Sequence, residues 1–412
     1  SFYSSTYNYN GVGSVENAFA YGARHALACF PLTNPDGTWI YSTPYTSYKV
    51  ANGRHAIYGN GNNVNIHRKA DFANTAELVL TPIKPLSITA NFTYRLHQNR
   101  NTNRSTNFYY REYPNADLGV YNSGAGENSL TETVDTWSYK AANVFATYKD
   151  TFANDHNLIV MAGFNYETQY RKDIEAYGKN LISDELSDLN LVVPNSDGVL
   201  ETAVYGGQSE YALAGFFGRV NYDYKGRYLI EISGRYDGTS RFAKGSRWGL
   251  FPSVSAGWRI SEEDFFAPAK AYVDNLKLRL SYGSLGNQNV GYYDYIRTIS
   301  IKDFAAFYFK EGASMGKYTQ ISSPNSPSLT WETSNQYNVG FDLSMLGNRL
   351  EATIEGYIRD TKDMLTTGKA LPSIYGATEP KTNSADLRTS GFEISIGWRD
   401  QFDIAGLPFG YN

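Results

Sequence analysis

The chain has 412 residues, a net charge of −4 and 15% aromatic residues, 35 of its residues being Tyr. The acidic balance excludes a basic nucleic-acid surface, and no stretch approaches the roughly 18 apolar residues that a membrane helix needs. Cys29 is the single cysteine, so an internal disulfide and a cysteine-based metal site are excluded. The Tyr content favours a wall whose amphipathic side chains lie at two membrane–water interfaces.

The first part of the chain, residues 1–71, is less regular than the rest. It is rich in Asn, Gly and Tyr, and residues 34–37 (Asn-Pro-Asp-Gly) are a strong turn signal. We expect strand-and-loop excursions here, mostly outside a membrane. The chain begins at Ser1 without a signal peptide, and its end at Asn412 reads as the entry to another strand. We therefore expect an internal fragment of a longer secreted precursor.

Residues 72–412 alternate with a period of two, which is the pattern of strands whose two faces meet different surroundings. In residues 228–236, for example, Ile230 and Ile232 point one way, whereas Glu231 and Arg235 point the other way. The alternation predicts about twelve strands. They lie near residues 72–83, 86–97, 134–149, 157–171, 208–223, 227–238, 248–260, 275–285, 293–309, 332–346, 349–361 and 387–400.

The connections between these strands alternate between tight turns and long polar loops. The tight turns are at residues 84–85, 150–156, 224–227 and 346–349, and a somewhat longer one spans 261–275, where Glu262 to Phe266 predicts a short helix. The loops on the other side are at residues 98–133, 172–207, 239–247, 286–330 and 362–386. Transmembrane β-barrels have short periplasmic turns and long extracellular loops. We therefore predict an all-β protein, a transmembrane antiparallel β-barrel.

Two sets of side chains follow from this prediction. Aromatic residues at the ends of apolar stripes should form the membrane girdle; they are Tyr228, Tyr236, Trp258 and Trp398. Charged residues at the alternate positions should line the lumen; they include Glu231, Arg235, Arg279 and Arg359, with Arg259, Lys277, Glu351 and Glu355.

Several segments resemble the SusC/RagA family of TonB-dependent outer-membrane transporters of Bacteroidetes. They occur in the family's order between residues 70 and 400. The matching segments are residues 70–78, 85–90, 236–242, 247–260, 278–288, 329–333, 357–365 and 387–393. Among them are Tyr-Asp-Gly-Thr-Ser-Arg-Phe from Tyr236 and Leu-Arg-Thr-Ser-Gly-Phe-Glu from Leu387.

The resemblance implies a 22-stranded, plugged barrel in the outer membrane, surrounded by its lipid. Residues 1–71 would be an irregular strand and extracellular-loop region, and residues 72–412 would be central barrel strands. The plug domain and the TonB box are not in this chain. The implied function is TonB-dependent import of oligosaccharides or glycans, or of peptides. The implied partners are a SusD-like surface lipoprotein and TonB–ExbB–ExbD, in a dimer of transporter–lipoprotein pairs, with no nucleic acid.

The residues themselves leave two other functions open, a passive porin or structural barrel without a plug, and a secreted carbohydrate-binding β-sandwich. Aromatic residues in the predicted loops are the candidates for substrate or lid contact, although they could also pack loops together. They are Tyr109, Tyr110, Tyr113, Tyr292, Tyr293, Tyr295, Phe307 and Tyr308, with Tyr121 close by.

Enzyme chemistry is not predicted. The five His residues lack metal-ligand spacing, and there is neither a nucleophile elbow nor a phosphate loop. Asp184 and Glu185 could bind Ca²⁺, but acidic pairs of this kind are common in polar loops. We expect no catalytic residue, no cofactor and no metal.

Overall fold

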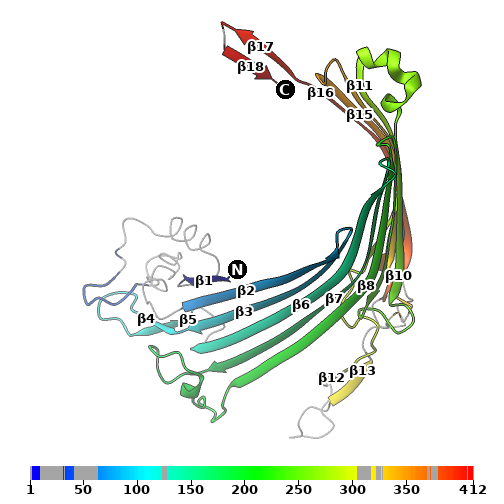
Figure 1. The fold of residues 1–412 in the computed structure, drawn as a ribbon. Helices are drawn as coiled ribbons and strands as arrows, with labels where there is room; N and C mark the ends of the chain where they lie inside the picture. Colours follow the sequence, from blue (N-terminus) through cyan, green and yellow to red (C-terminus); the bar gives the residue numbers. More distant parts are fainter. Residues whose placement is uncertain are drawn as a thin grey trace. The chain divides into compact units, whose positions relative to one another are not determined.

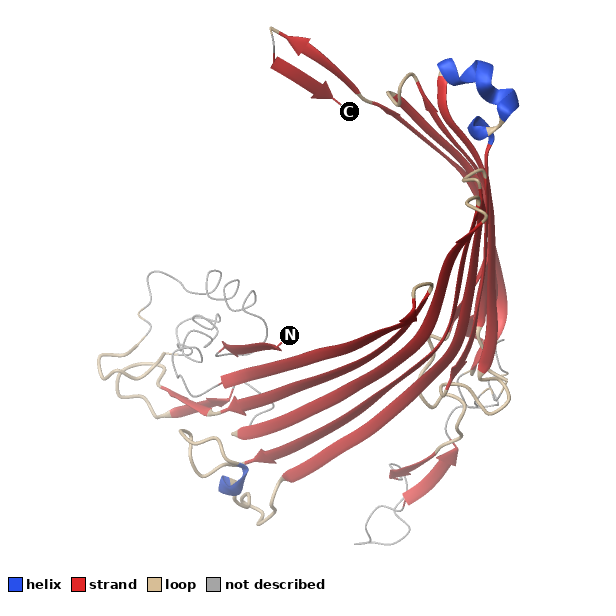
Figure 2. Ribbon diagram, viewed as in Figure 1, coloured by secondary structure: helices blue, strands red, loops and turns tan. Residues whose placement is uncertain are grey.

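The computed structural model describes residues 2–9, 31, 33–40, 64–122, 128–303, 317–321, 326, 328–368, 372, 379–405 and 407–411. Cys29, Phe307 and Tyr308 lie outside these residues, as does the side chain of Tyr121. Strands dominate the described chain, and its helices are short 3-10 segments at Leu189–Leu191, Ile260–Glu262 and Asp264–Ala271 (Figure 2). No described helix combines the length and the apolar character needed to cross a membrane.

Twelve of the described strands form one sheet, in the order β1-β2-β3-β6-β7-β8-β9-β10-β11-β14-β15-β16 (Figure 1). Their bounds are β1 Phe2–Tyr9, β2 Val64–Ile83, β3 Leu86–Ser105, β6 Ser129–Phe152, β7 His156–Lys179, β8 Thr202–Tyr224, β9 Tyr228–Thr239, β10 Trp248–Arg259, β11 Val273–Asn287, β14 Glu332–Met345, β15 Leu350–Thr367 and β16 Lys381–Trp398. Three separate hairpins pair β4 (Asn107–Tyr110) with β5 (Gly119–Asn122), β12 (Ile299–Asp303) with β13 (Lys317–Ile321), and β17 (Asp400–Ile404) with β18 (Leu407–Tyr411).

Eleven of the predicted strands are confirmed, and the ninth, at residues 293–309, is wrong. Strand β11 pairs directly with β14, as in the partners Leu280 and Val339, so no strand fits between them. Of its described residues, 293–303, only Ile299–Asp303 are extended, and they pair with β13 in a separate hairpin. The helix expected from Glu262 is present, as part of two short 3-10 helices.

The chain divides into two compact units. The first comprises residues 1–74, 93–139 and 169–210, and the second comprises residues 75–92, 140–168 and 211–412. In the first unit, β1 pairs with the start of β2 in antiparallel register, with Phe2 opposite Phe72. The second unit holds β9 to β16 and the tight turns.

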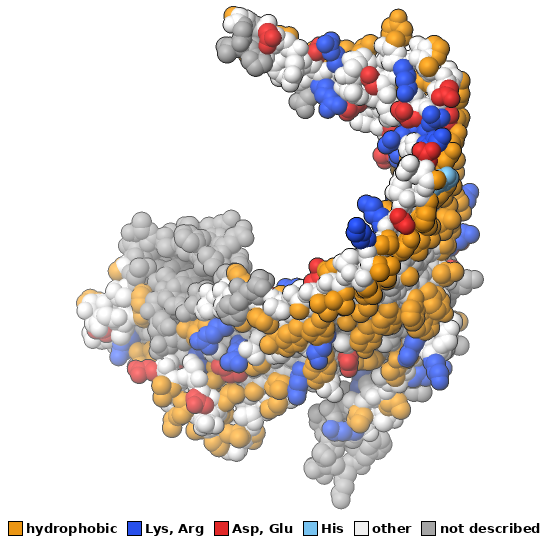
Figure 3. Space-filling view, viewed as in Figure 1, with side chains coloured by type: hydrophobic (Ala, Val, Ile, Leu, Met, Phe, Trp, Pro, Cys, Tyr) orange, Lys and Arg blue, Asp and Glu red, His pale blue; other side chains and the backbone are white. Residues whose placement is uncertain are grey.

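Register gives the sheet of the second unit one apolar face. Successive partners across five strands are Val220, Ile232, Val254, Tyr282 and Tyr337. Further along the same face, Phe341 pairs with Ile354, which in turn pairs with Ile394. Most of these side chains are exposed, Ile394 to 58%, and hydrophobic side chains gather over the strands in Figure 3. An exposed apolar face of this extent needs an apolar environment.

The tight turns follow from local backbone preference. Lys225 and Gly226 both have positive φ (54° and 65°) in the turn between β8 and β9, as two-residue hairpin turns of the primed type require. The turn between β14 and β15 also has positive φ, at Leu346 (59°), Gly347 (68°) and Asn348 (61°). Glycine adopts this conformation without steric cost, so both predicted turns are well specified by their sequence.

A buried arginine organises the loops of the first unit. Arg104 is 2% exposed and donates to the carbonyl oxygens of Ser129 (3.1 Å) and Ser183 (2.7 Å), and to the side chain of Asn128. Asn128 in turn donates to the carboxylate of Asp184 at 2.9 Å. These contacts fix the ends of two long loops to one another. The carboxylate that the sequence offered for Ca²⁺ is therefore engaged by an amide.

Candidate functional site

The candidate site is the polar face of the sheet in the second unit. This is the face opposite to the apolar one. Glu231, Arg235, Arg279 and Arg359 all occupy alternate positions to the apolar residues of their strands. These four of the residues predicted to line the lumen therefore share one face.

Arginine–carboxylate pairs within the wall dominate this face. Arg235 binds Asp237 through two hydrogen bonds of 3.0 and 2.8 Å, and Arg279 binds Asp342 in the same way at 2.8 and 3.0 Å. Glu355 lies 3.9 Å from the guanidinium of Arg279. Two-pronged pairs of this kind fix the orientation of the guanidinium.

The other predicted charges also have neighbours on the wall. Glu231 lies 3.8 Å from Arg219, and Arg359 donates two hydrogen bonds of 3.1 and 3.0 Å to the side-chain oxygen of Gln336. The sequence pointed to the charges but not to these partners. Asp237 could have been found, because it lies two positions from Arg235 and so on the same face. The sequence could not have shown that Asp342 is the partner of Arg279, because their proximity depends on the register between β11 and β14.

Two hollows lie along this face. One has a volume of about 410 Å³, and its lining includes Asp223, Leu229, Glu231, Gly257, Lys277 and Arg279. The other, of about 450 Å³, is lined by Phe217, Arg219, Arg235, Asp237, Phe251 and Leu285, among others. The guanidinium of Arg235 lies 5.4 Å from the centre of the Phe217 ring. The second hollow thus offers aromatic surface and charge together, which suits an amphipathic ligand.

The aromatic residues that follow β11 are used in part to hold their loop. Tyr292 stacks on Tyr211 with ring centres 5.4 Å apart, and the guanidinium of Arg241 lies 4.5 and 4.9 Å from these two rings. Arg241 also donates to the carbonyl oxygen of Val290 at 3.3 Å. Tyr293, 46% exposed, makes an edge contact with Tyr292. The loop-packing interpretation therefore fits Tyr292 better than substrate contact.

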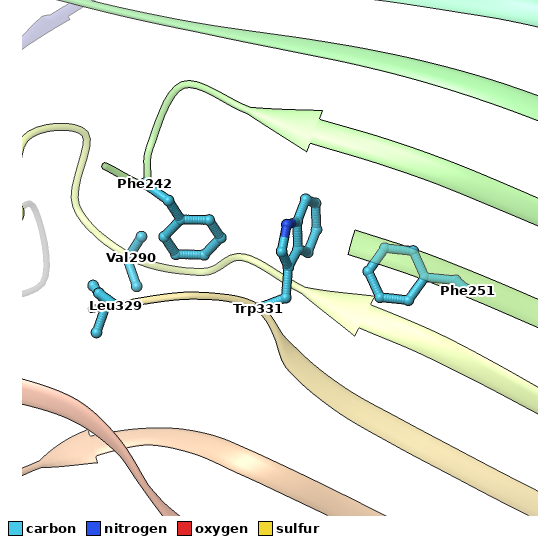
Figure 4. Close-up of a cluster of buried hydrophobic side chains, with 5 residues drawn as sticks. All are labelled: Phe242, Phe251, Val290, Leu329 and Trp331. Atoms are coloured by element: carbon cyan, nitrogen blue, oxygen red, sulfur yellow. The ribbon is translucent and has the colours of Figure 1, made fainter. Parts of the chain in front are cut away.

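A buried apolar cluster holds the two ends of the same loop. Trp331 lies between Phe242 and Phe251, with ring centres 5.7 and 5.2 Å away, beside Val290 and Leu329 (Figure 4). Its indole nitrogen donates to the carbonyl oxygen of Arg247 at 2.9 Å. The segment that leaves β11 and the segment that enters β14 are thus packed on the β9–β10 connection.

In the first unit, the predicted Tyr residues lie on or near the β4–β5 hairpin. Tyr109 and Tyr113 are 45% and 47% exposed, so they are accessible to a ligand or partner. Tyr110 instead covers Gly119, where a Cβ atom would come within 2.7 Å of its ring. Only two of these three residues are therefore presented at the surface.

A further cluster of the first unit was not predicted. Trp137 stacks on His97 with ring centres 5.1 Å apart, and the guanidinium of Arg95 lies 5.1 Å from the Trp137 ring. Asp71 binds both Arg95 (2.5 to 3.1 Å) and His97 (3.3 Å). Its members come from three strands, so no local sequence signal could have found it. Within the described residues, no group of three or more His, Cys, Asp or Glu is arranged to hold a metal.

The predicted girdle residues lie at both ends of the apolar face. Tyr236 stacks on Trp248 at 4.9 Å, and Tyr228 pairs with Trp258 at the opposite ends of the same two strands. Glu263 accepts hydrogen bonds from Tyr228 (2.6 Å) and from the Trp258 indole (3.0 Å). These donors, Tyr228 first, hold the pKa of Glu263 below its usual value. Aromatic rings with a polar tip are what a membrane interface selects.

An antiparallel sheet with one apolar face, one charged face, aromatic margins and alternating tight turns and long loops defines the wall of a transmembrane β-barrel. Comparison with known proteins identifies the kind of β-barrel. Residues 3–412 match the family described as "TonB dependent receptor-like, beta-barrel". The chain belongs to this family, and it is an outer-membrane protein.

The relatives confirm the resemblance to SusC and RagA. A TonB-dependent receptor of Formosa agariphila is 29% identical over 396 residues, which cover 93% of this chain and 34% of that protein. The TonB-dependent receptor SusC of Bacteroides thetaiotaomicron is 31% identical over 280 residues, 66% of this chain and 26% of that protein. This chain therefore spans about a third or less of these relatives.

Solved structures confirm the fold. The RagAB peptide importer in its "closed-closed" state has a TM-score of 0.71 with 22% identity, over 98% of this chain and 42% of that chain. A further RagAB structure, described as a peptide transporter, has a TM-score of 0.69 over 90% of this chain and 38% of that chain. The alternative of a secreted β-sandwich is wrong, because twelve of the described strands form a single sheet and the family is a barrel.

Proposed function

We propose that this chain forms part of the wall of a TonB-dependent importer for oligosaccharide or peptide nutrients. The observation that carries the proposal is the two-faced wall in a chain that matches the barrel of this family over residues 3–412. Its apolar face suits the membrane, and its charged face carries two hollows of several hundred Å³. Both SusC and the RagAB peptide importer resemble this chain; the likeness to RagAB supports peptides, and oligosaccharides are proposed from the SusC/RagA family resemblance.

The orientation and the partners belong to the same proposal. The tight turns would face the periplasm and the long loops the cell exterior. A SusD-like lipoprotein would cover the loops, where Tyr109, Tyr113 and Tyr293 are exposed. A plug domain would fill the barrel, and TonB with ExbB and ExbD would supply the energy. We further propose a dimer of transporter–lipoprotein pairs and no enzymatic activity.

Uptake of labelled substrate by whole cells tests the proposal. Cells with the full-length protein should import oligosaccharide or peptide, and deletion of tonB or of the lipoprotein gene should abolish import. Import that persists at the same rate without TonB would instead support a passive porin. An R219Q/R235Q double variant should reduce import of charged substrates, whereas K244A, an exposed change in the β9–β10 connection, should not.

A further inference from the structure

The connection between β10 and β11, residues 260–272, is longer than its position requires. At the same end of the wall, the two residues Lys84 and Pro85 suffice to join β2 to β3. The longer connection instead forms the 3-10 helices Ile260–Glu262 and Asp264–Ala271. Figure 2 shows both helices at the end of the sheet where β11 begins. The extra residues therefore build a separate element beside the tight turns, which we call the connecting segment.

Glu263 attaches the connecting segment to the membrane side of the wall. Tyr228 and Trp258 are cross-strand partners, and two positions along the strands the partners on the same face are Ile230 and Ala256. Both polar tips donate to the Glu263 carboxylate, the Tyr228 hydroxyl at 2.6 Å and the Trp258 indole at 3.0 Å. Because both rings belong to the apolar face, the carboxylate that joins their tips lies on that side of the wall.

The connecting segment exposes apolar side chains. Phe265 and Tyr272 are each 68% exposed, more than most aromatic residues of the described chain. Ala267, Pro268 and Ala271 are exposed between them. Exposed apolar groups of this kind mark a surface that meets a partner or a membrane. Here they continue from the aromatic margin of the apolar face, so the environment of that face is the one that they would share.

The charges of the segment are paired and do not favour an anionic partner. Lys270 lies 3.4 Å from Glu262. Arg227, from the turn before β9, lies 3.4 Å from Glu263 and 3.7 Å from Asp264. These pairs contain three carboxylates and two cations, so they provide no positive excess. Attraction to a lipid surface would therefore depend on the burial of apolar area and not on charge.

We propose that the connecting segment lies in the headgroup region of the phospholipid leaflet at the tight-turn end of the wall. Phe265 and Tyr272 contact lipid there, and Glu263 holds the segment against the wall. A phospholipid surface is the partner because the segment is attached to the side of the wall that faces the membrane, next to rings that suit a membrane interface. The inference is independent of what the barrel imports and of which side of the membrane the tight turns face.

The accessibility of spin labels tests the proposal in the full-length protein, reconstituted into phosphatidylcholine vesicles. F265C and Y272C carry the label, and K84C, in the two-residue turn between β2 and β3, is the control; other accessible cysteines are replaced, C29S included. Oxygen concentrates in lipid, whereas a nickel chelate stays in water. Labels at residues 265 and 272 should relax faster with oxygen than with nickel, and the label at residue 84 should show the reverse. Addition of phosphatidylglycerol should change neither result, because the segment has no positive excess.

The role of Glu263 is tested with the label at residue 265. E263A removes the acceptor of Tyr228 and Trp258, so this label should become more accessible to nickel. E262A is the matched control and should leave the accessibility unchanged. Heat-modifiable mobility in gels identifies the folded barrel in each variant, so a misassembled variant is not mistaken for a released segment.

The opposite results are distinct. Faster relaxation with nickel at residues 265 and 272 would overturn the proposal and leave both side chains to a protein partner. Faster relaxation with oxygen at residue 84 as well would overturn a special role for the segment, because the whole tight-turn margin would then lie in lipid. Lipid contact that requires phosphatidylglycerol would overturn insertion by apolar side chains. Unchanged accessibility in E263A would overturn the role of Glu263.

Discussion

Asn383 is the residue that most directly ties a loop to the wall. Its side-chain oxygen accepts from the amide of Thr330 at 3.0 Å, and its nitrogen donates to the carbonyl oxygens of Thr330 (2.9 Å) and Asp363 (2.8 Å). It thus pairs with the backbone of Thr330 as another strand would. An amide side chain from β16 therefore helps to hold the segment that enters β14, together with the Trp331 cluster.

N383A should loosen this segment without unfolding the wall. Three backbone groups lose their partner: the half-buried amide and carbonyl of Thr330 and the more exposed carbonyl of Asp363. A buried group left unsatisfied costs about 1–3 kcal/mol, so we expect the loss at Thr330 to dominate. Hydrogen exchange at the amides of Thr330 and Trp331 should become faster by at least tenfold. S384A, next to Asn383, is the control and should leave these amides protected. Equal protection in N383A would contradict the role assigned to the side chain.

Arg241 gives a second prediction at this scale. R241K keeps the charge but loses the planar guanidinium that lies near the rings of Tyr211 and Tyr292, a contact worth about 0.5–2 kcal/mol. Faster hydrogen exchange is expected over residues 290–297 than in the parent. K244A in the same connection should have no effect. Parent-like exchange in R241K would show that the Trp331 cluster alone fixes this loop.

At the scale of elements, the connection between β10 and β11 is tied to the girdle by Glu263. Arg227 also approaches this carboxylate, at 3.4 Å, and the Glu263 side chain is 13% exposed. The two 3-10 helices therefore dock on the tight-turn ends of β9 and β10 through one ionised group. Both the aromatic residues and the carboxylate were visible in the sequence, but their contact was not.

The pH dependence of stability follows from the lowered pKa of Glu263. The ionised carboxylate is favoured in the folded protein, so its contribution is complete above the ordinary value of 4.5 and is lost as the pH falls through the lower folded value. Thermal unfolding of the parent and E263Q should differ at pH 7 and converge near pH 3. A difference in unfolding temperature between the parent and E263Q that stays constant with pH would exclude a role for the charge of Glu263. E262Q is the control, because Glu262 is 45% exposed and contacts Lys270 at 3.4 Å.

At the scale of the whole molecule, the two faces of the wall should tolerate a charge differently. I394R places an arginine on the apolar face and S395R places it one position away on the polar face. A charged residue on the lipid face near mid-membrane costs about 2–4 kcal/mol, whereas lumen substitutions are tolerated. I394R should therefore assemble poorly in the outer membrane, measured by heat-modifiable mobility in gels. Equal assembly of both variants would contradict the assignment of faces.

The sequence by itself determined the strands, the tight turns and the two faces. Alternation with a period of two is a local property, and glycine at positive φ specifies turns such as Lys225–Gly226 without help from the rest of the chain. The ninth predicted strand failed for the same reason. Residues 299–303 are locally extended, but only pairing between β11 and β14 excludes them from the sheet.

Only the tertiary structure decided which side chains meet. Arg279 binds Asp342, which is far away in the chain. The guanidinium of Arg241 likewise lies against the rings of Tyr211 and Tyr292, which come from distant segments. Register and loop packing set these contacts, and a one-residue slip would move each side chain to the other face. The same register places Asp360 and Arg388 on the apolar face of their strands, although both side chains are charged.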